Sequence, residues 1–172
     1  VNKVVSGSTK AELEVTKNWN KPNGTTLLKE DTKYIFSGVG SRRSIQMITK
    51  LTAQKEDVSF TDNKEGLLGI RLARELEHPS DKPEKFTDAK GIATSVAQLN
   101  NKGVTGMYRS SEGVEGDAVW STRGKWVNLN GKIDKEPVSL VIIDHPQNVG
   151  YPTHWHARGY GLFAANPLGQ KE

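Results

Sequence analysis

The sequence predicts an all-β protein built as an antiparallel β-sandwich, and two patterns carry this prediction. Short runs alternate apolar and polar residues with a period of two, which is typical of strands that have one buried face. Glycine, asparagine, aspartate and proline separate these runs at close intervals, as in turns between antiparallel strands. With 172 residues, 34% of them hydrophobic and 26% charged, the chain fits a single domain over residues 1–172.

The alternating runs predict strands along most of the chain. In chain order, the predicted strands cover residues 11–15, 34–36, 45–53, 58–60, 69–73, 116–120, 126–129, 138–143 and 154–157. The run VSLVII at 138–143 is almost continuously apolar, which favours a central strand covered on both faces. Asn130 and Gly131 follow the run at 126–129, and this dipeptide predicts a hairpin turn there.

The segment 75–116 differs from the rest and predicts an excursion from the sheets. Residues 75–90 are polar and contain prolines and aspartates, as in a long loop. Ile92, Val96 and Leu99 are spaced to form an apolar stripe on two helical turns, so we expect a short helix over 92–99. Long excursions in compact domains are often functional, although a tolerated surface insertion explains the pattern equally well.

Composition argues against several classes of function. The net charge is +4, and the basic residues are scattered among acidic ones, which disfavours a nucleic-acid partner. The chain has no cysteine, which excludes disulfides, thiolate metal sites and cysteine nucleophiles. No run is long and apolar enough to span a bilayer, so we expect no membrane span.

The run THWHARGY at 153–160 gathers the most chemically versatile side chains. On a strand, His154 and His156 point to one face and Trp155 to the other. Two imidazoles on one face can bind a metal ion, bind a hydroxyl group or transfer protons. A metal needs a third ligand, which Asp144 and its neighbour His145 can supply from the end of the preceding strand. Alternatively, the histidines hydrogen-bond loop carbonyls.

Two further groups are candidates for binding or catalysis. Glu65 lies at the start of the strand that carries Arg71, and a carboxylate beside cations can act as a general base. The alternative is a turn followed by a surface ion pair. Trp120 and Trp126 flank a basic turn with Arg123, a combination that suits stacking on sugar rings. The alternative is that both tryptophans anchor a hairpin in the core.

Several motifs occur in an order that is more specific than any one motif alone. They are Trp19, Leu27-Leu28-Lys29-Glu30, Asn63-Lys64-Glu65-Gly66, Gly69-Ile70-Arg71, Ser110-Ser111-Glu112-Gly113, Val119-Trp120, Trp126-Val127, Ile143-Asp144-His145-Pro146 and the run PTHWHARGYGLFAANPLG at 152–169. This order resembles the DUF6807 family, whose members often carry the label "methane oxygenase PmoA". The resemblance implies an all-β fold akin to the galactose-mutarotase supersandwich. It also implies a protein of polysaccharide-degrading bacteria, with a periplasmic or extracellular location favoured over a cytoplasmic one.

Three departures from the family pattern refine these expectations. Members usually carry an earlier motif of the kind DHPHHRG, which is absent here. The chain therefore resembles the C-terminal part of a member, and we expect a missing N-terminal half or another chain to complete it. His154 stands where relatives often have tyrosine or arginine, which makes His156 the better candidate for proton transfer. Gln46 stands where aspartate is expected, which weakens any role there.

The leading hypothesis is a protein that binds or acts on a carbohydrate or another small polar ligand. Glu65 is then the base and His156 the acid of a proton transfer on a sugar. The expected binding residues are Arg71, Trp120, Arg123, Trp126, Asp144, His145, Arg158, Tyr160 and Asn166. We expect Glu65, Arg71, Asp144, His145 and His156 to converge in one cleft; the alternative spreads them over separate surfaces.

Two other functional classes stay open. One is a non-catalytic module that binds a glycan or a partner chain through Trp120, Trp126 and Trp155. The other is the metal-dependent oxygenase of the family label, for which His154, His156 and Asp144 are the candidate ligands. No cofactor other than such a metal ion is expected.

Overall fold

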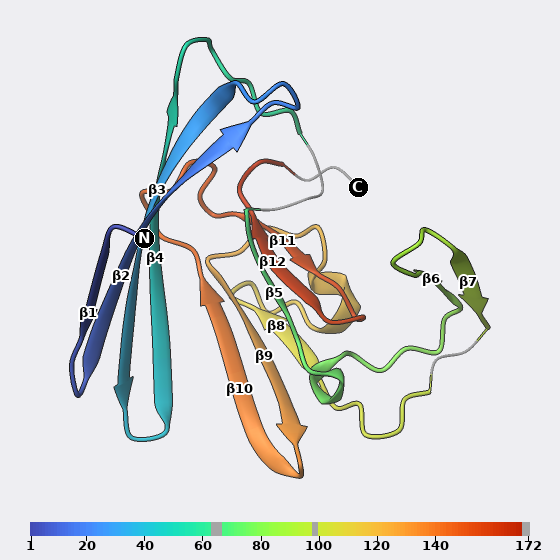
Figure 1. The fold of residues 1–172 in the computed structure, drawn as a ribbon. Helices are drawn as coiled ribbons and strands as arrows, with labels where there is room; N and C mark the ends of the chain where they lie inside the picture. The colour runs from blue at the N-terminus through green and yellow to red at the C-terminus, as the bar shows by residue number, and fades with distance from the viewer. Residues whose placement is uncertain (63–66, 98–99, 170–172) are drawn as a thin grey trace. The chain divides into compact units, whose positions relative to one another are not determined.

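The computed structural model of the chain is an all-β fold of antiparallel sheets, which confirms the predicted fold class (Figure 1). The structure describes residues 1–62, 67–97 and 100–169. The chain divides into two compact units, Val1–Phe60 and Thr61–Glu172, called here the first and second units. None of the helices in the described ranges has the length and apolarity that crossing a bilayer requires.

The first unit is a four-stranded antiparallel meander in the order β1-β2-β3-β4. Its strands are β1 (Lys3–Ser6), β2 (Lys10–Asn20), β3 (Thr26–Val39) and β4 (Arg42–Ala53). The runs predicted at 11–15, 34–36 and 45–53 lie within β2, β3 and β4. The strand predicted at 58–60 is wrong, because these residues have no strand partner. Instead, the Phe60 ring packs edge-on against Trp19, with 6.4 Å between the ring centroids.

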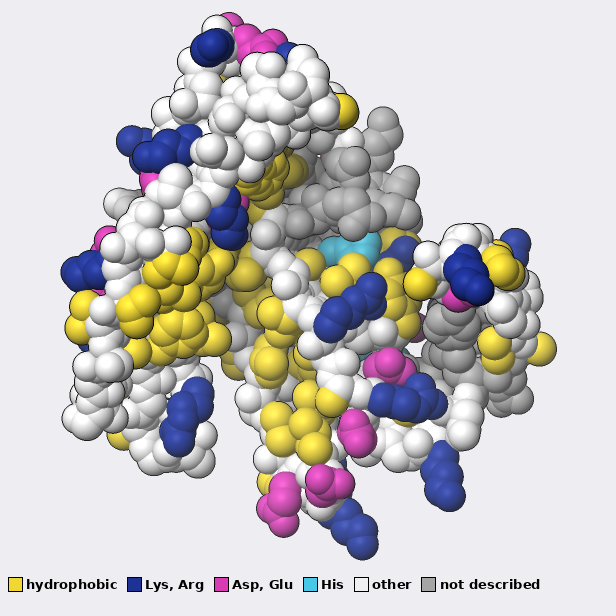
Figure 2. Space-filling view, in the orientation of Figure 1, with side chains coloured by type: hydrophobic (Ala, Val, Ile, Leu, Met, Phe, Trp, Pro, Cys, Tyr) yellow, Lys and Arg dark blue, Asp and Glu magenta, His cyan; other side chains and the backbone are white. Residues whose placement is uncertain are grey.

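The two faces of this meander differ sharply in polarity. Leu13, Tyr34 and Met47 oppose one another across β2, β3 and β4, so they share an apolar face. On that face the Ile45 side chain is 65% exposed, and Figure 2 shows hydrophobic side chains gathered over these strands. The other face carries charged residues in register, including Glu14 opposite Lys33. The period-two pattern of the sequence is therefore the alternation between these two faces.

Glu12 is the focus of the charged face. Its carboxylate oxygens lie 2.8 Å from Lys10 Nζ and 2.7 Å from Lys33 Nζ. Hydrogen bonds from these two ammonium groups lower the pKa of Glu12 to about 2.

Glu30 is the corresponding acid of the apolar face, and its side chain is buried. One carboxylate oxygen accepts hydrogen bonds from Lys17 Nζ at 2.9 Å and Thr32 Oγ1 at 2.8 Å. The other accepts a hydrogen bond from Trp19 Nε1 at 2.8 Å. Burial raises the pKa of Glu30, but these three hydrogen bonds outweigh burial and leave the pKa below 4.5.

We expect the first unit to lose stability as the pH falls from about 4.5 towards 2. Both Glu12 and Glu30 have folded-state pKa values below the ordinary 4.5, so protons bind the unfolded chain more readily. Their contribution is present above pH 4.5 and is lost as each carboxylate protonates in the folded state. The check is the urea midpoint as a function of pH for the wild type and for the Glu12→Gln, Glu30→Gln double variant. The variant should show a flatter acid limb, and equal slopes for both proteins would contradict this account.

The second unit contains two three-stranded antiparallel sheets and a separate hairpin. One sheet has the order β10-β9-β8 and the other the order β11-β12-β5, while β6 pairs with β7. The strands are β5 (Leu68–Arg71), β6 (Glu84–Thr87), β7 (Ala93–Val96), β8 (Met107–Ser110), β9 (Trp126–Ile133), β10 (Glu136–Ile143), β11 (His154–Ala157) and β12 (Leu162–Asn166). Two short 3-10 helices, η1 (Arg74–Leu76) and η2 (Gly116–Val119), connect them.

The two three-stranded sheets pack face to face around one core. Tyr108 and Leu129 point inward from β8 and β9, and Trp155 and Phe163 point inward from β11 and β12. The Phe163 ring centroid lies 5.2 Å from that of Tyr108 and 6.1 Å from that of Trp155. Trp155 Nε1 donates a 2.9 Å hydrogen bond to the Gly124 carbonyl, so the buried indole is satisfied. Each sheet thus has one face in the core and one outer face.

The short helix predicted over 92–99 is wrong, because Ala93–Val96 forms strand β7. A turn closes the β6-β7 hairpin: Asp88 Oδ1 accepts from the Lys90 and Ile92 amides, and Gly91 has φ +80°. Thr94 and Val96 are β-branched and favour the strand over the helix. Leu99, the last residue of the expected stripe, lies outside the described residues. Residues 75–116 therefore contain this hairpin and also strand β8, which pairs with β9 within a sheet.

Two other local predictions are also corrected. Residues 116–119 form η2 and not a strand, since Gly116 has φ +61°. Asn130 and Gly131 lie inside β9, and the β9-β10 turn falls at Asp134 and Lys135, with φ 51° and 72°. A Cβ at Gly131 would lie 2.6 Å from Leu76 Cδ2, so the glycine makes room for a core side chain.

Strand β10 lies at the edge of its sheet, which corrects the prediction of a central strand at 138–143. Its inner face buries Ile142, but Val141 and Ile143 are 47% and 72% exposed on the outer face. The run at 138–143 is almost continuously apolar because its inner residues lie in the core and its outer residues form an exposed apolar surface.

Candidate functional site

The outer face of the β11-β12-β5 sheet gathers most of the polar residues that the sequence predicts as functional. His156 opposes Ala164, which opposes Gly69, while Leu162 opposes Arg71. Directly opposed residues point to the same side of an antiparallel sheet, so alternation places the members of this set opposite the core. We call the outer side chains of His154, His156, Arg158, Asn166 and Arg71 the polar face.

The centre of the polar face is shielded from solvent. His156 is 4% exposed and Asn166 is 3% exposed, although neither points into the hydrophobic core. Asn166 Oδ1 accepts a hydrogen bond from the Leu168 amide at 3.2 Å. His156 is therefore a buried histidine on the outer face of its sheet.

Trp120 packs over the polar face between a histidine and an arginine. Its ring meets the His156 ring edge-on, with 6.1 Å between centroids. The Arg158 guanidinium carbon lies 3.2 Å from the centroid of the same indole. The chain after Trp120 is fixed to β11 because the Ser121 amide donates to the Trp155 carbonyl at 2.8 Å. This backbone hydrogen bond holds the Trp120 indole beside His156.

Tyr160 forms the second aromatic contact of the polar face. Its ring centroid lies 5.8 Å from the guanidinium carbon of Arg158 and 5.5 Å from that of Arg71. Arg71 comes from β5 and Arg158 from the end of β11, so Tyr160 in the turn between β11 and β12 joins the two. Arg158 Nε is buried, and no residue in the described part of the chain accepts a hydrogen bond from it.

Asp144 and His145 lie in the β10-β11 loop, and Arg123, between η2 and β9, contacts this loop. Asp144 accepts hydrogen bonds from Asn148 Nδ2 at 2.8 Å and from the Thr153 amide at 2.9 Å. Arg123 donates to the carbonyls of Pro152 and Gly150 at 2.8 and 2.7 Å. These bonds fix the loop that leads into β11. His145 is exposed, and its Nδ1 accepts from the Gln147 amide at 3.2 Å.

Trp126 lies on the other side of the second unit. Its neighbour Val127 points into the core, so the Trp126 ring points to the outer face of the β10-β9-β8 sheet. There it lines a shallow apolar hollow with Asn128, Val141 and Ile143. The core separates Trp126 from Trp120, and the structure does not bring the two tryptophans together. Trp155 lies in that core and is 1% exposed.

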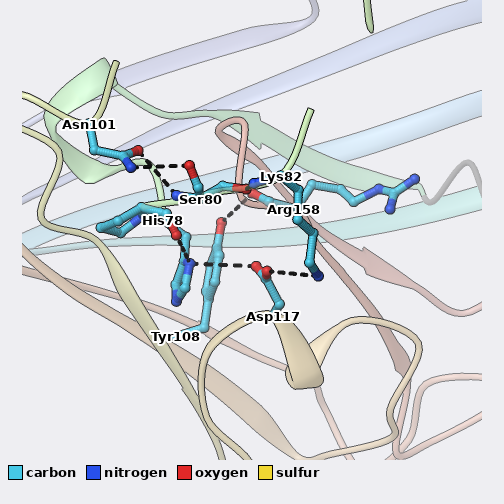
Figure 3. Close-up of polar contacts among 8 residues, drawn as sticks. His78, Ser80, Lys82, Asn101, Tyr108, Asp117 and Arg158 are labelled. Atoms are coloured by element: carbon cyan, nitrogen blue, oxygen red, sulfur yellow. Dashed lines mark hydrogen bonds and ion pairs between the residues drawn. The ribbon is translucent and has the colours of Figure 1, made fainter. Parts of the chain in front are cut away.

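A polar cluster that the sequence alone did not reveal supports the turn that carries Arg158 (Figure 3). His78 Nδ1 lies 3.5 Å from Asp117 Oδ1, and Lys82 Nζ lies 3.9 Å from Asp117 Oδ2. The His78 amide donates to the Gly159 carbonyl at 2.9 Å, and the Tyr108 hydroxyl donates to the Arg158 carbonyl at 3.2 Å. Burial raises the pKa of the Tyr108 hydroxyl, which keeps it a donor.

This cluster was missed because its members are far apart in the sequence. His78 precedes Asp117 by a long segment that includes the β6-β7 hairpin. Ser80 and Asn101 are similarly distant, yet Asn101 accepts from the Ser80 amide at 3.1 Å and donates to its carbonyl at 3.0 Å. The only sequence signal was the long excursion itself, which indicated a segment with a role beyond connecting strands.

The candidate metal ligands are only partly brought together. His154 and His156 share the polar face, whereas both carboxylate oxygens of Asp144 bond within the loop. Across the described ranges, no three histidine, aspartate or glutamate side chains gather as a metal site. Glu65, the predicted base, lies outside the described residues, so its distance from His156 stays a prediction.

The sequence matches the family of unknown function DUF6807 over residues 1–172. The chain belongs to the DUF6807 family. No curated protein and no solved structure matches it. Two motifs that carried the resemblance correspond to specific contacts in this DUF6807 protein. Trp19 donates to Glu30 in the first unit, and the run at 152–167 forms the β11-β12 hairpin of the polar face.

Proposed function

We propose that this DUF6807 protein binds a carbohydrate at the polar face and that His156 transfers a proton to or from the bound sugar. The observation that carries the proposal is the packing of Trp120 against both His156 and Arg158. Sugar sites combine an aromatic ring, which stacks on C–H surfaces, with polar groups that bind hydroxyls. Trp120 and Tyr160 offer the rings, and Arg71, Arg158 and Asn166 offer the polar groups.

Proton transfer suits His156 because imidazole changes its charge near neutral pH. A reaction such as the interconversion of sugar anomers needs an acid and a base within hydrogen-bond reach of the ring. Glu65 is the proposed second group, since it precedes the strand that carries Arg71. A buried histidine packed against an indole has a fixed ring orientation, which favours directed proton transfer over general surface buffering.

A saturation-transfer NMR screen of free monosaccharides tests binding, and exchange NMR between the α and β anomers tests turnover. We expect His156→Asn to bind the sugar within about threefold of the wild type but to lose anomer exchange, because the amide keeps a hydrogen bond and cannot carry the proton. The matched control is His145→Asn, on the exposed loop, which should retain both.

Unchanged exchange in His156→Asn would contradict the catalytic role. Binding without any exchange by the wild type would favour the second candidate function, a non-catalytic glycan- or partner-binding module. The observation that favours this alternative is the exposed apolar surface at Trp126, Val141 and Ile143.

A further inference from the structure

We propose that the sugar bound at the polar face bears a carboxylate, as in a uronic acid, and that Arg71 and Arg158 bind this group together. This inference rests on the proposed carbohydrate site and names its substrate class. The starting observation is that both guanidiniums approach the same Tyr160 ring, at 5.5 and 5.8 Å from its centroid. Arg71 at the end of β5 and Arg158 just after β11 thus approach the same aromatic ring.

The charge of this arginine pair is not compensated within the described residues. Neither Arg71 nor Arg158 has an ion pair there, and the nearby acids bond elsewhere. Glu77 Oε2 lies 3.1 Å from Arg74 Nη1, and Asp117 lies beside His78 and Lys82. Two cations at the same aromatic ring favour an anionic ligand, since the ligand reduces their mutual repulsion.

The Arg158 guanidinium has a fixed orientation, which suits a group that binds a ligand. Its stacking on Trp120, at 3.2 Å from the indole centroid, fixes the plane of the guanidinium. The indole covers the flat face of the guanidinium, and the N–H groups at its edge stay available for hydrogen bonds. The Nε donor is buried and unpartnered in the described part of the chain, which is costly unless a ligand accepts from it.

A carboxylate is the ligand group that best fits this arrangement. Its two coplanar oxygens match the parallel N–H bonds of a guanidinium, and the pairing is stronger than a neutral hydrogen bond. A neutral hydroxyl accepts one such bond and leaves the positive charge uncompensated. The geometry therefore favours an acidic over a neutral sugar.

Isothermal titration of the wild type with glucuronate, galacturonate, glucose and galactose tests the proposal. We expect a uronate to bind at least about tenfold tighter than the neutral sugar of the same configuration, with the difference shrinking at high salt. Arg71→Gln should remove about tenfold of the uronate affinity and leave the neutral sugar nearly unchanged. Arg158→Lys keeps the charge and loses the paired geometry, so it should also weaken uronate binding.

Arg109→Gln, at an exposed residue of strand β8 in the other sheet, is the matched control and should bind as the wild type does. Arg71 is exposed, so its variant keeps the test valid if an Arg158 variant fails to fold. Equal affinity for uronate and neutral sugar would overturn this inference alone. Tighter binding of a sulfated sugar than of either uronate would also overturn it. Failure of every sugar, neutral or acidic, to bind would instead overturn the proposed function.

Discussion

Alanine at Gly106 should destabilise the second unit by about 3 kcal/mol or more, because the backbone of the η1 segment leaves no room for a side chain. A Cβ at this position would lie 2.0 Å from the Leu76 carbonyl oxygen and 2.6 Å from that of Glu77. Both obstacles are backbone atoms, and the Gly106 amide itself donates to the Glu77 carbonyl at 2.8 Å. The chain can relieve the clash only by breaking the bonds that join the η1 segment to Thr105 and Gly106.

Urea unfolding of Gly106→Ala measures this effect, and Gly159→Ala is its control. A Cβ at Gly159 would meet Asp117 Oδ1 at 3.4 Å and His78 Cβ at 3.6 Å, which are ordinary contacts. The control should therefore stay within about 1 kcal/mol of the wild type. A Gly106→Ala protein as stable as its control would show that the carbonyls of Leu76 and Glu77 do not lie against Gly106.

Trp155→Ala should lower the free energy of unfolding by about 3–5 kcal/mol, the cost of deleting a large buried aromatic side chain. The indole is 1% exposed and packs on Phe163, with 6.1 Å between the ring centroids. Its removal also leaves the Gly124 carbonyl without the 2.9 Å hydrogen bond from Nε1.

Trp155→Phe separates the two contributions, because phenylalanine fills most of the volume and lacks the N–H donor. It should lose less stability than Trp155→Ala when both are unfolded in urea. The opposite pattern, a stable Trp155→Ala protein that no longer binds sugar, would place Trp155 in the binding site and contradict its place in the core.

The fold class could be predicted because period-two alternation is a local property of the sequence. Residues 11–15 alternate because one face of the meander is apolar and the other charged. Predictions from local patterns were wrong where tertiary contacts determine the secondary structure. Gly131 looks like a turn residue, yet it accommodates Leu76 within β9. Residues 92–99 have a helical apolar spacing, yet the Asp88 turn and β-branched residues make a hairpin.

The candidate site could be predicted only in part. His154 and His156 of β11 share a face with Arg158, just after the strand, by simple alternation. The sequence does not show that Trp120 belongs to the polar face and Trp126 does not. That difference depends on the burial of Val127, because its neighbour Trp126 then points to the outer face of the other sheet. The pairing of His78 with Asp117 depends on how the excursion returns to the sheet, and no local pattern contains that information.

Indole N–H signals in a ¹H–¹⁵N NMR spectrum give the most direct test of the polar face as the binding site. The chain has four tryptophans, so each indole can be assigned by substitution. On titration with the sugar that binds, the account predicts a shift of the Trp120 signal, while those of Trp19 and Trp126 stay in place. A shift of Trp126 with Trp120 unmoved would contradict it and place the ligand on the outer face of the β10-β9-β8 sheet.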